Sequence, residues 1–132
     1  MAEPFNVLIV DDEEDFRETL IKRLKKRHLD VFGAESGQKA LDLMNKLLFD
    51  VVVLDVKMPG LDGIDTLREM KKKNPFMEVI LLTGHASMES GVEGMNLGAF
   101  DYVMKPVNID DLMEMIRQAY ERKLIQEENR KK

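Results

Sequence analysis

Five polar side chains follow short apolar runs of this sequence: Asp11, Asp12, Asp55, Thr83 and Lys105. If these runs are parallel strands of one sheet, their carboxyl ends meet at the same edge, and ligands of open α/β sheets bind beyond that edge. Three carboxylates, one hydroxyl and one ammonium would then lie together. This grouping is the strongest chemical signal in the sequence.

Three carboxylates at close range repel one another, by about 3 kcal/mol per pair at ~5 Å and an effective dielectric constant of about 20. Such a cluster either raises the pKa of a member or binds a cation, and carboxylate oxygens suit Mg²⁺. The cation would allow one carboxylate to attack a phosphoryl group, a transfer that needs positioning and charge neutralisation. Mg²⁺, Lys105 and the Thr83 hydroxyl could supply that neutralisation.

Each of these residues alone has a simpler explanation. Asp11 and Asp12 could cap a helix, since Asp is favoured at helix N-caps. Thr83 could merely end a strand, and Lys105 could be solvated. Asp55 is harder to explain, because a carboxylate that closes a buried strand is costly unless it is paired. The chemical interpretation therefore depends on all five residues lying at one edge.

The segments that would position these residues alternate between two kinds. Apolar runs predict strands buried on both faces, as in a parallel sheet covered by helices; they span Val7–Val10, Leu29–Ala34, Val51–Leu54, Val79–Leu82 and Tyr102–Met104. Between and after them lie amphipathic segments with helical spacing. The alternation predicts an α/β fold, a three-layer sandwich with right-handed βαβ connections.

Some helix ends can also be predicted. Ser36 is a candidate N-cap of the second helix. Glu13 and its two acidic successors begin the first helix, where negative charge complements the helix dipole. The helix at 87–96 contains Gly91 and Gly94, each of which costs about 1 kcal/mol relative to alanine. We expect this helix to be the most mobile.

The composition limits the possible classes of protein. The chain has 132 residues, 44% hydrophobic and 34% charged, as expected for one folded domain. A net charge of −5 argues against direct binding to nucleic acid. The absence of cysteine excludes disulfides and Cys-based metal sites. No apolar run has the length of a membrane span, and the start lacks the pattern of a secretory signal. We therefore expect a cytoplasmic protein without membrane contact.

Four motifs together resemble the receiver domain of bacterial response regulators, the CheY-like superfamily, over residues 5 to about 125. These motifs are VLIVDDEEDFRETL, VVVLDVKMPGLDGID, VILLTGHAS and GAFDYVMKP. The resemblance implies a flavodoxin-like (βα)5 fold, in which a doubly wound five-stranded parallel sheet has the order 2-1-3-4-5. We expect residues 1–125 to form the receiver domain and residues 126–132 to be a polar tail or the start of a linker helix.

The resemblance also assigns roles at the predicted edge. It implies that Asp55 is the phosphoacceptor and that Mg²⁺ is bound by Asp11, Asp12, Asp55 and the backbone carbonyl of Lys57. It further implies that Thr83 bonds a phosphoryl oxygen.

Further residues receive supporting roles from the same resemblance. Lys105 pairs with the phosphoryl charge, and the Lys105–Pro106 peptide is cis. Tyr102 is the aromatic residue that turns inward on activation. Lys57 and His85, each two positions past a site residue, help to set the lifetime of the phosphorylated form.

The implied function is a switch in a two-component phosphorelay rather than a metabolic enzyme. A histidine kinase or phosphotransfer protein would supply the phosphoryl group, which the domain would later hydrolyse. The conformational change would reach the surface formed by the 87–96 helix, the last strand and the last helix. That surface could contact an output domain, a target protein or a second copy of the chain.

Two other classes of protein share some of these features. An aspartate-nucleophile phosphatase of small phosphoesters normally has a second Asp two residues after the nucleophile, where this chain has Lys57. A flavin-binding domain of similar topology needs a loop rich in Ser, Thr and Gly after the first strand. Asp11 and Asp12 stand there instead and would repel phosphate.

Overall fold

The computed structural model describes residues 4–57, 63–84 and 88–130. Its strands are β1 (Asn6–Val10), β2 (Asp30–Ala34), β3 (Val51–Asp55), β4 (Glu78–Thr83) and β5 (Asp101–Met104). Its helices are α1 (Glu14–Lys25), α2 (Gly37–Met44), α3 (Gly63–Lys73), α4 (Met88–Asn96) and α5 (Ile109–Arg130). All strand pairs are parallel, and the sheet order is β2-β1-β3-β4-β5. The predicted fold class and strand order are confirmed.

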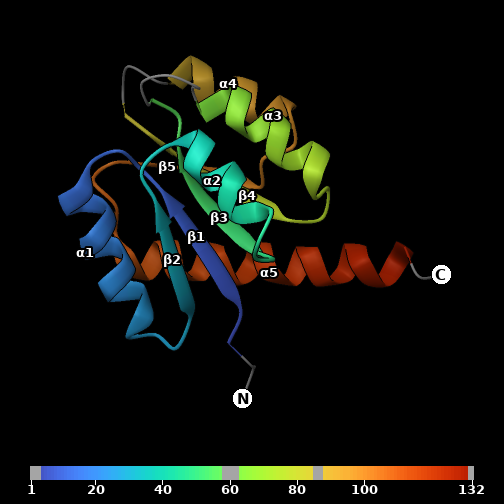
Figure 1. Cartoon of the computed structure of the whole chain (residues 1–132), viewed down its shortest axis with the longest axis horizontal. Helices are drawn as coiled ribbons and strands as arrows, with labels where there is room; N and C mark the ends of the chain where they lie inside the picture. Colours follow the sequence, from blue (N-terminus) through green and yellow to red (C-terminus); the bar gives the residue numbers. More distant parts are fainter. Residues whose placement is uncertain (1–3, 58–62, 85–87, 131–132) are drawn as a thin grey trace.

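The sheet is the middle of three layers (Figure 1). Side chains of β1 alternate between its two faces: Val7 and Ile9 pack with α1 and α5, whereas Leu8 and Val10 pack with α2 and α3. All four are fully buried, and burial of a side chain of this size contributes roughly 1.5–3 kcal/mol. Apolar residues on both faces explain why the strands appear in the sequence as unbroken runs.

The strand register brings the carboxyl ends of the central strands level with one another. Val10 pairs with Leu54, so Asp11 emerges beside the end of β3. Farther along the sheet, Asp55 pairs with Leu82 and Thr83 pairs with Met104. Asp11 after β1, Asp55 at the end of β3 and Thr83 at the end of β4 therefore lie at the same edge of the sheet.

Helix termini agree in part with the sequence patterns. The Ser36 hydroxyl accepts a 3.1 Å hydrogen bond from the Lys39 amide, which confirms the predicted N-cap. The N-cap of α1 is Glu13 and not an aspartate, and its side chain makes no capping bond. In α4, a Cβ added to Gly94 would lie 2.2 Å from Leu81 Cδ1. This glycine therefore lets α4 approach β4 closely, while the predicted mobility of the helix stays a prediction.

The last helix, α5, continues well past the sheet (Figure 1). Arg122 donates two hydrogen bonds to the fully buried carboxylate of Glu78 at the start of β4. One residue further along, Lys123 Nζ lies 2.8 Å from Asp50 Oδ1. The helix runs unbroken through residue 125, so the division between receiver domain and tail stays a prediction. Within the described ranges, no helix has an apolar stretch long enough to span a bilayer.

Candidate functional site

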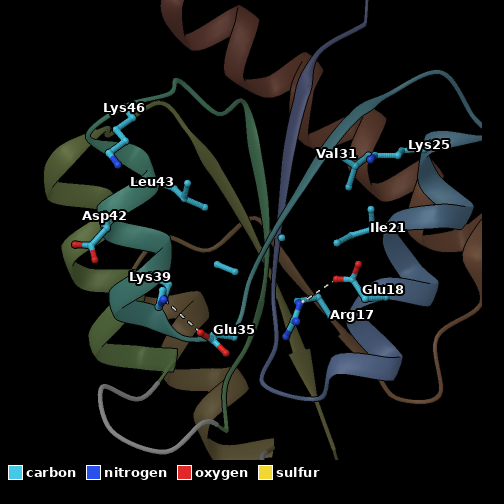
Figure 2. A pocket seen from close by; sticks show the side chains of 12 residues that line it. Arg17, Glu18, Ile21, Lys25, Val31, Glu35, Lys39, Asp42, Leu43 and Lys46 are labelled. Carbon is cyan, nitrogen blue, oxygen red and sulfur yellow. Dashed lines mark hydrogen bonds and ion pairs between the residues drawn. The ribbon is translucent and has the colours of Figure 1, made fainter.

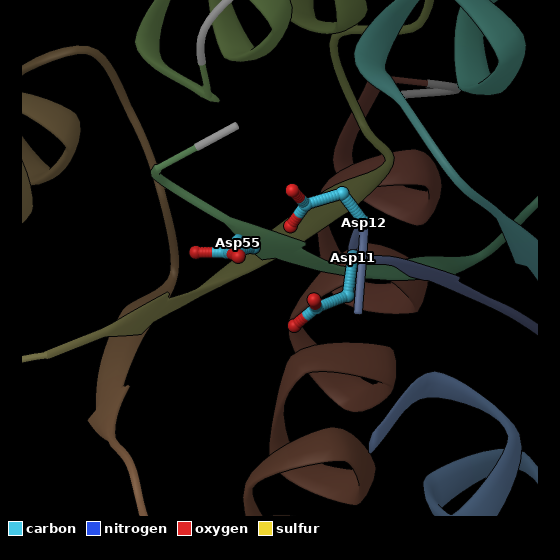
Figure 3. A group of neighbouring side chains, drawn as sticks. All are labelled: Asp11, Asp12 and Asp55. Atoms are coloured by element: carbon cyan, nitrogen blue, oxygen red, sulfur yellow. The ribbon is translucent and has the colours of Figure 1, made fainter. Parts of the chain in front are cut away.

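Asp11, Asp12 and Asp55 form a cluster at the carboxyl edge of the sheet (Figure 3). One oxygen of each carboxylate lies within 4.8 Å of one oxygen of each of the others. Asp11 and Asp55 are buried, whereas Asp12 is exposed. Three hard oxygen donors at this spacing, with one side open to solvent, fit a divalent cation such as Mg²⁺. The predicted proximity of the three carboxylates is confirmed.

The environment of Asp55 opposes its ionisation. Burial raises the pKa of this carboxyl above its usual range, and the nearby charges of Asp11 and Asp12 raise it further. The Lys57 amide, which donates a 3.0 Å hydrogen bond to Asp55 Oδ1, and the Lys105 ammonium act in the opposite direction. A bound cation would favour the ionised form, which is the form that can act as a nucleophile.

Lys105 extends from the end of β5 into the carboxylate cluster. Its Nζ lies 3.0 Å from Asp11 Oδ2 and 3.6 Å from Asp55 Oδ2. Burial alone would lower the pKa of Lys105, but its acidic neighbours outweigh burial and raise it. Lys105 therefore supplies a stable positive charge next to the carboxylate of Asp55. Its peptide bond to Pro106 is cis, as expected.

Thr83 is a buried hydroxyl residue on β4, next to β3. Its Oγ1 has no hydrogen-bond partner in the part of the chain that the structure describes. A buried hydroxyl without a partner is unfavourable by about 1–3 kcal/mol, so this atom is suited to meet an incoming acceptor oxygen. Tyr102 on the neighbouring strand pairs with Leu81 and is 36% exposed. Tyr102 is therefore partly exposed at the surface of the sheet edge.

The two residues predicted to tune the lifetime can be placed only in part. Lys57 follows the end of β3, and its side chain is exposed. His85 lies outside the described residues, as do residues 58–62. Gly63 at the start of α3 lies close to the end of β3: a Cβ on Gly63 would lie 2.4 Å from the Val56 Cα, so a side chain has no room there.

Two residues of the site were not identified from the sequence as functional. Glu13 Oε1 lies 3.2 Å from Lys105 Nζ, and the Phe16 ring centroid lies 4.5 Å from the same atom. The sequence patterns assign Glu13 only to the start of a helix, and the helical spacing of Phe16, Leu20 and Leu24 assigns Phe16 only to an apolar stripe of that helix. A third acid directly after the Asp pair was the available signal, but its contact with Lys105 requires the three-dimensional placement of α1.

A hollow away from the carboxylate cluster lies over the edge strand β2, between α1 and α2 (Figure 2). Charged residues of both signs line it, including Arg17 and Glu18 on α1 and Lys39 with Glu35 at the start of α2. None of the five predicted edge residues contributes to it. The residues that line this hollow are therefore different from those of the carboxylate cluster.

The chain is an α/β domain with a five-stranded parallel sheet, whose carboxyl edge carries the acidic cluster and Lys105. Residues 7–117 match the family described as the response regulator receiver domain. The chain belongs to this family.

Solved structures of receiver domains have the same fold. The receiver domain protein from Clostridium thermocellum is 37% identical with a TM-score of 0.88, over 92% of this chain and 98% of that one. The CheY-like receiver domain protein from Methanospirillum hungatei JF-1 is 31% identical with a TM-score of 0.88, over 94% and 99% of the two chains.

Longer proteins also contain a similar segment. Regulatory protein AtoC of Escherichia coli is 37% identical over 94% of this chain and 27% of its own length. DNA-binding transcriptional regulator NtrC of Klebsiella pneumoniae is 35% identical over 84% of this chain and 24% of its own length. The chain spans about a quarter of these curated relatives.

Proposed function

We propose that this receiver domain takes a phosphoryl group onto the Asp55 carboxylate. The observation that carries the proposal is the position of that carboxylate, beside Asp11 and Asp12 and 3.6 Å from the Lys105 ammonium. An oxygen of Asp55 would attack phosphorus as the bond from phosphorus to the donor breaks. Lys105 would neutralise the charge that is transferred, and the Thr83 hydroxyl would donate to a phosphoryl oxygen.

We propose Mg²⁺ as the cofactor, held by Asp11, Asp12, Asp55 and the carbonyl of Lys57. When bound, the ion would neutralise negative charge on the carboxylates and the phosphoryl oxygens. The close oxygens of the three aspartates support this assignment.

The proposed role is that of a regulated switch, with only self-phosphorylation and self-dephosphorylation as catalysis. The phosphodonor would be a histidine kinase or phosphotransfer protein, and the reaction would take place in the cytoplasm. Two longer relatives are named a regulatory protein and a transcriptional regulator, which supports an output domain as the target of the signal.

The proposed signalling surface is formed by α4, β5 and α5. Val92 and Met95 on α4 are 59% and 37% exposed, and Tyr102 on β5 is 36% exposed. Apolar side chains at the surface favour contact with another protein, either an output domain or a second copy of this chain. Reorientation of Tyr102 would change the shape of this surface.

The test is incubation with acetyl phosphate, with and without Mg²⁺. An acyl phosphate is labile to hydroxylamine, so the proposal predicts a hydroxylamine-sensitive modification that forms only when Mg²⁺ is present. A modification that resists hydroxylamine, or forms equally well without a divalent cation, would contradict the proposal.

A further inference from the structure

The Lys105 ammonium lies among three carboxylates and not only the two that the proposed function uses. Its Nζ lies 3.0 Å from Asp11 Oδ2, 3.2 Å from Glu13 Oε1 and 3.6 Å from Asp55 Oδ2. The lysine is therefore closer to Glu13 than to the proposed phosphoacceptor. A hydrogen bond accompanies the ion pair with Glu13.

Glu13 is held in place by its backbone. Its amide donates a 2.9 Å hydrogen bond to Asp11 Oδ1, and its carbonyl accepts one of 2.9 Å from the Arg17 amide in the first turn of α1. Phe16, one turn further along α1, places its ring 4.5 Å from Lys105 Nζ. The backbone bonds of Glu13 therefore anchor the start of α1 where its carboxylate and the Phe16 ring lie beside Lys105.

The three carboxylates differ in what they would do during phosphorylation. Asp11 is a proposed ligand of the cation, which would weaken its attraction for Lys105. Asp55 would gain roughly 1.5 to 2 negative charges with the phosphoryl group. Glu13 has neither role, and its side chain is 67% exposed. Glu13 is thus the carboxylate left to compete with the phosphoryl group for Lys105.

We propose that Glu13 is a positioning residue that shares the Lys105 ammonium with Asp55 in the unphosphorylated domain and competes with the phosphoryl group for the lysine. This inference rests on the proposed function and adds regulation to the same site. The charge of Glu13 would lower the affinity of the site for phosphoryl groups.

The first measurement detects the contact in the free protein. Glu13→Gln keeps the size of the side chain and removes its charge. Glu14→Gln makes the same change at the next, exposed residue, for which the described contacts include none with Lys105. We expect the NMR resonance of Lys105 Nζ to shift in Glu13→Gln and to stay unchanged in Glu14→Gln. Equal shifts in the two variants would contradict a contact between Glu13 and Lys105 in the free protein.

The second measurement is titration of the Mg²⁺-loaded protein with beryllofluoride, a mimic of the phosphoryl group, followed by amide NMR. We expect Glu13→Gln to bind about two- to five-fold more tightly than the wild type, because a largely exposed ion pair contributes a modest free energy. Glu14→Gln should match the wild type. Unchanged or weaker binding of beryllofluoride by Glu13→Gln would contradict the proposal that Glu13 competes with the phosphoryl group for Lys105.

Glu13→Asp separates the contact from charge alone. It keeps the negative charge but withdraws the carboxylate by one methylene, so we expect it to bind beryllofluoride more tightly, as Glu13→Gln does. Wild-type affinity would mean that charge alone matters and would overturn the positioning role. A wild type that fails to bind beryllofluoride with Mg²⁺ would instead overturn the proposed function, and the competition with it.

Discussion

The backbone amide of Lys105 donates a 2.8 Å hydrogen bond to the carbonyl oxygen of Thr83. The two residues whose side chains are proposed to contact the phosphoryl group are therefore joined through their backbones at the ends of β4 and β5. Because of this hydrogen bond, a displacement of Thr83 toward Asp55 would also displace the end of β5, the strand that carries Tyr102. This bond is a short physical link between the proposed site and the proposed signalling surface.

Thr83→Ala should separate phosphorylation from signalling. The alanine variant keeps Asp55 and the acidic cluster but lacks the hydroxyl that would move toward the phosphoryl oxygens. In the wild type, addition of Mg²⁺ and beryllofluoride should shift the amide resonances of residues 92–104. In Thr83→Ala, the same resonances should shift much less. If the wild type shifts only at Asp11, Asp12 and Asp55, the proposed route through β5 is wrong.

Mg²⁺ should stabilise the folded domain, because it relieves the repulsion that helps to raise the pKa of Asp55. A ligand at 100 times its Kd adds about 2.7 kcal/mol to the free energy of unfolding if it binds only the folded state. Thermal melts should show a higher Tm with Mg²⁺ for the wild type. The increase should be reduced in Asp12→Asn and kept in Asp15→Asn, which removes a neighbouring exposed charge outside the cluster. Equal increases in both variants would argue against the assigned ligands.

Lys57 and His85 should affect the lifetime of the phosphorylated form more than the stability of the fold. Lys57 is exposed two residues after the end of β3, where its side chain could obstruct the approach of water to phosphorus. Replacing both residues by alanine should change the rate of dephosphorylation by a factor of several. Lys72→Ala, at an exposed lysine on α3, is the control. A lifetime within error of the wild type would show that neither side chain reaches the path of the water.

The predictable part of the fold and site follows from local patterns. Val51–Leu54 is a short, mainly β-branched apolar run typical of a strand covered on both faces, and Asp55 follows it directly. Once the strands are parallel, the carboxyl ends must share an edge. The proximity of Asp55 to Asp11 and Lys105 could therefore be predicted without coordinates.

Contacts that depend on how a helix is placed could not be predicted in this way. Glu13 contacts Lys105 across 92 positions of the sequence, because α1 begins beside the end of β5. Glu78 at the start of β4 is fully buried. A charged residue is almost never fully buried unless it is paired, so its type alone predicts an exposed position. Its burial depends on Arg122 and Lys71, which lie on two different helices. No periodicity in the sequence links these residues.

Arg122→Gln should destabilise the domain, because it leaves the buried carboxylate of Glu78 with Lys71, 3.6 Å away, as its remaining described ion-pair partner. Loss of one member of a buried ion pair costs about 3–5 kcal/mol, and the 40% exposure of the Arg122 side chain reduces the expected loss to about 2 kcal/mol. Arg117→Gln removes an exposed pair on the same helix and should cost less than about 0.5 kcal/mol. Urea denaturation measures both, and equal losses would contradict the importance of the Glu78 pair.

The most direct test of the account is identification of the residue that carries the phosphoryl group. The domain is incubated with acetyl phosphate and Mg²⁺, the acyl phosphate is trapped by borohydride reduction, and the modified peptide is identified by mass spectrometry. The account predicts modification at Asp55 alone, and none in a folded Asp55→Asn variant. Modification of another residue, or full modification of Asp55→Asn, would contradict the central claim that Asp55 is the phosphoacceptor.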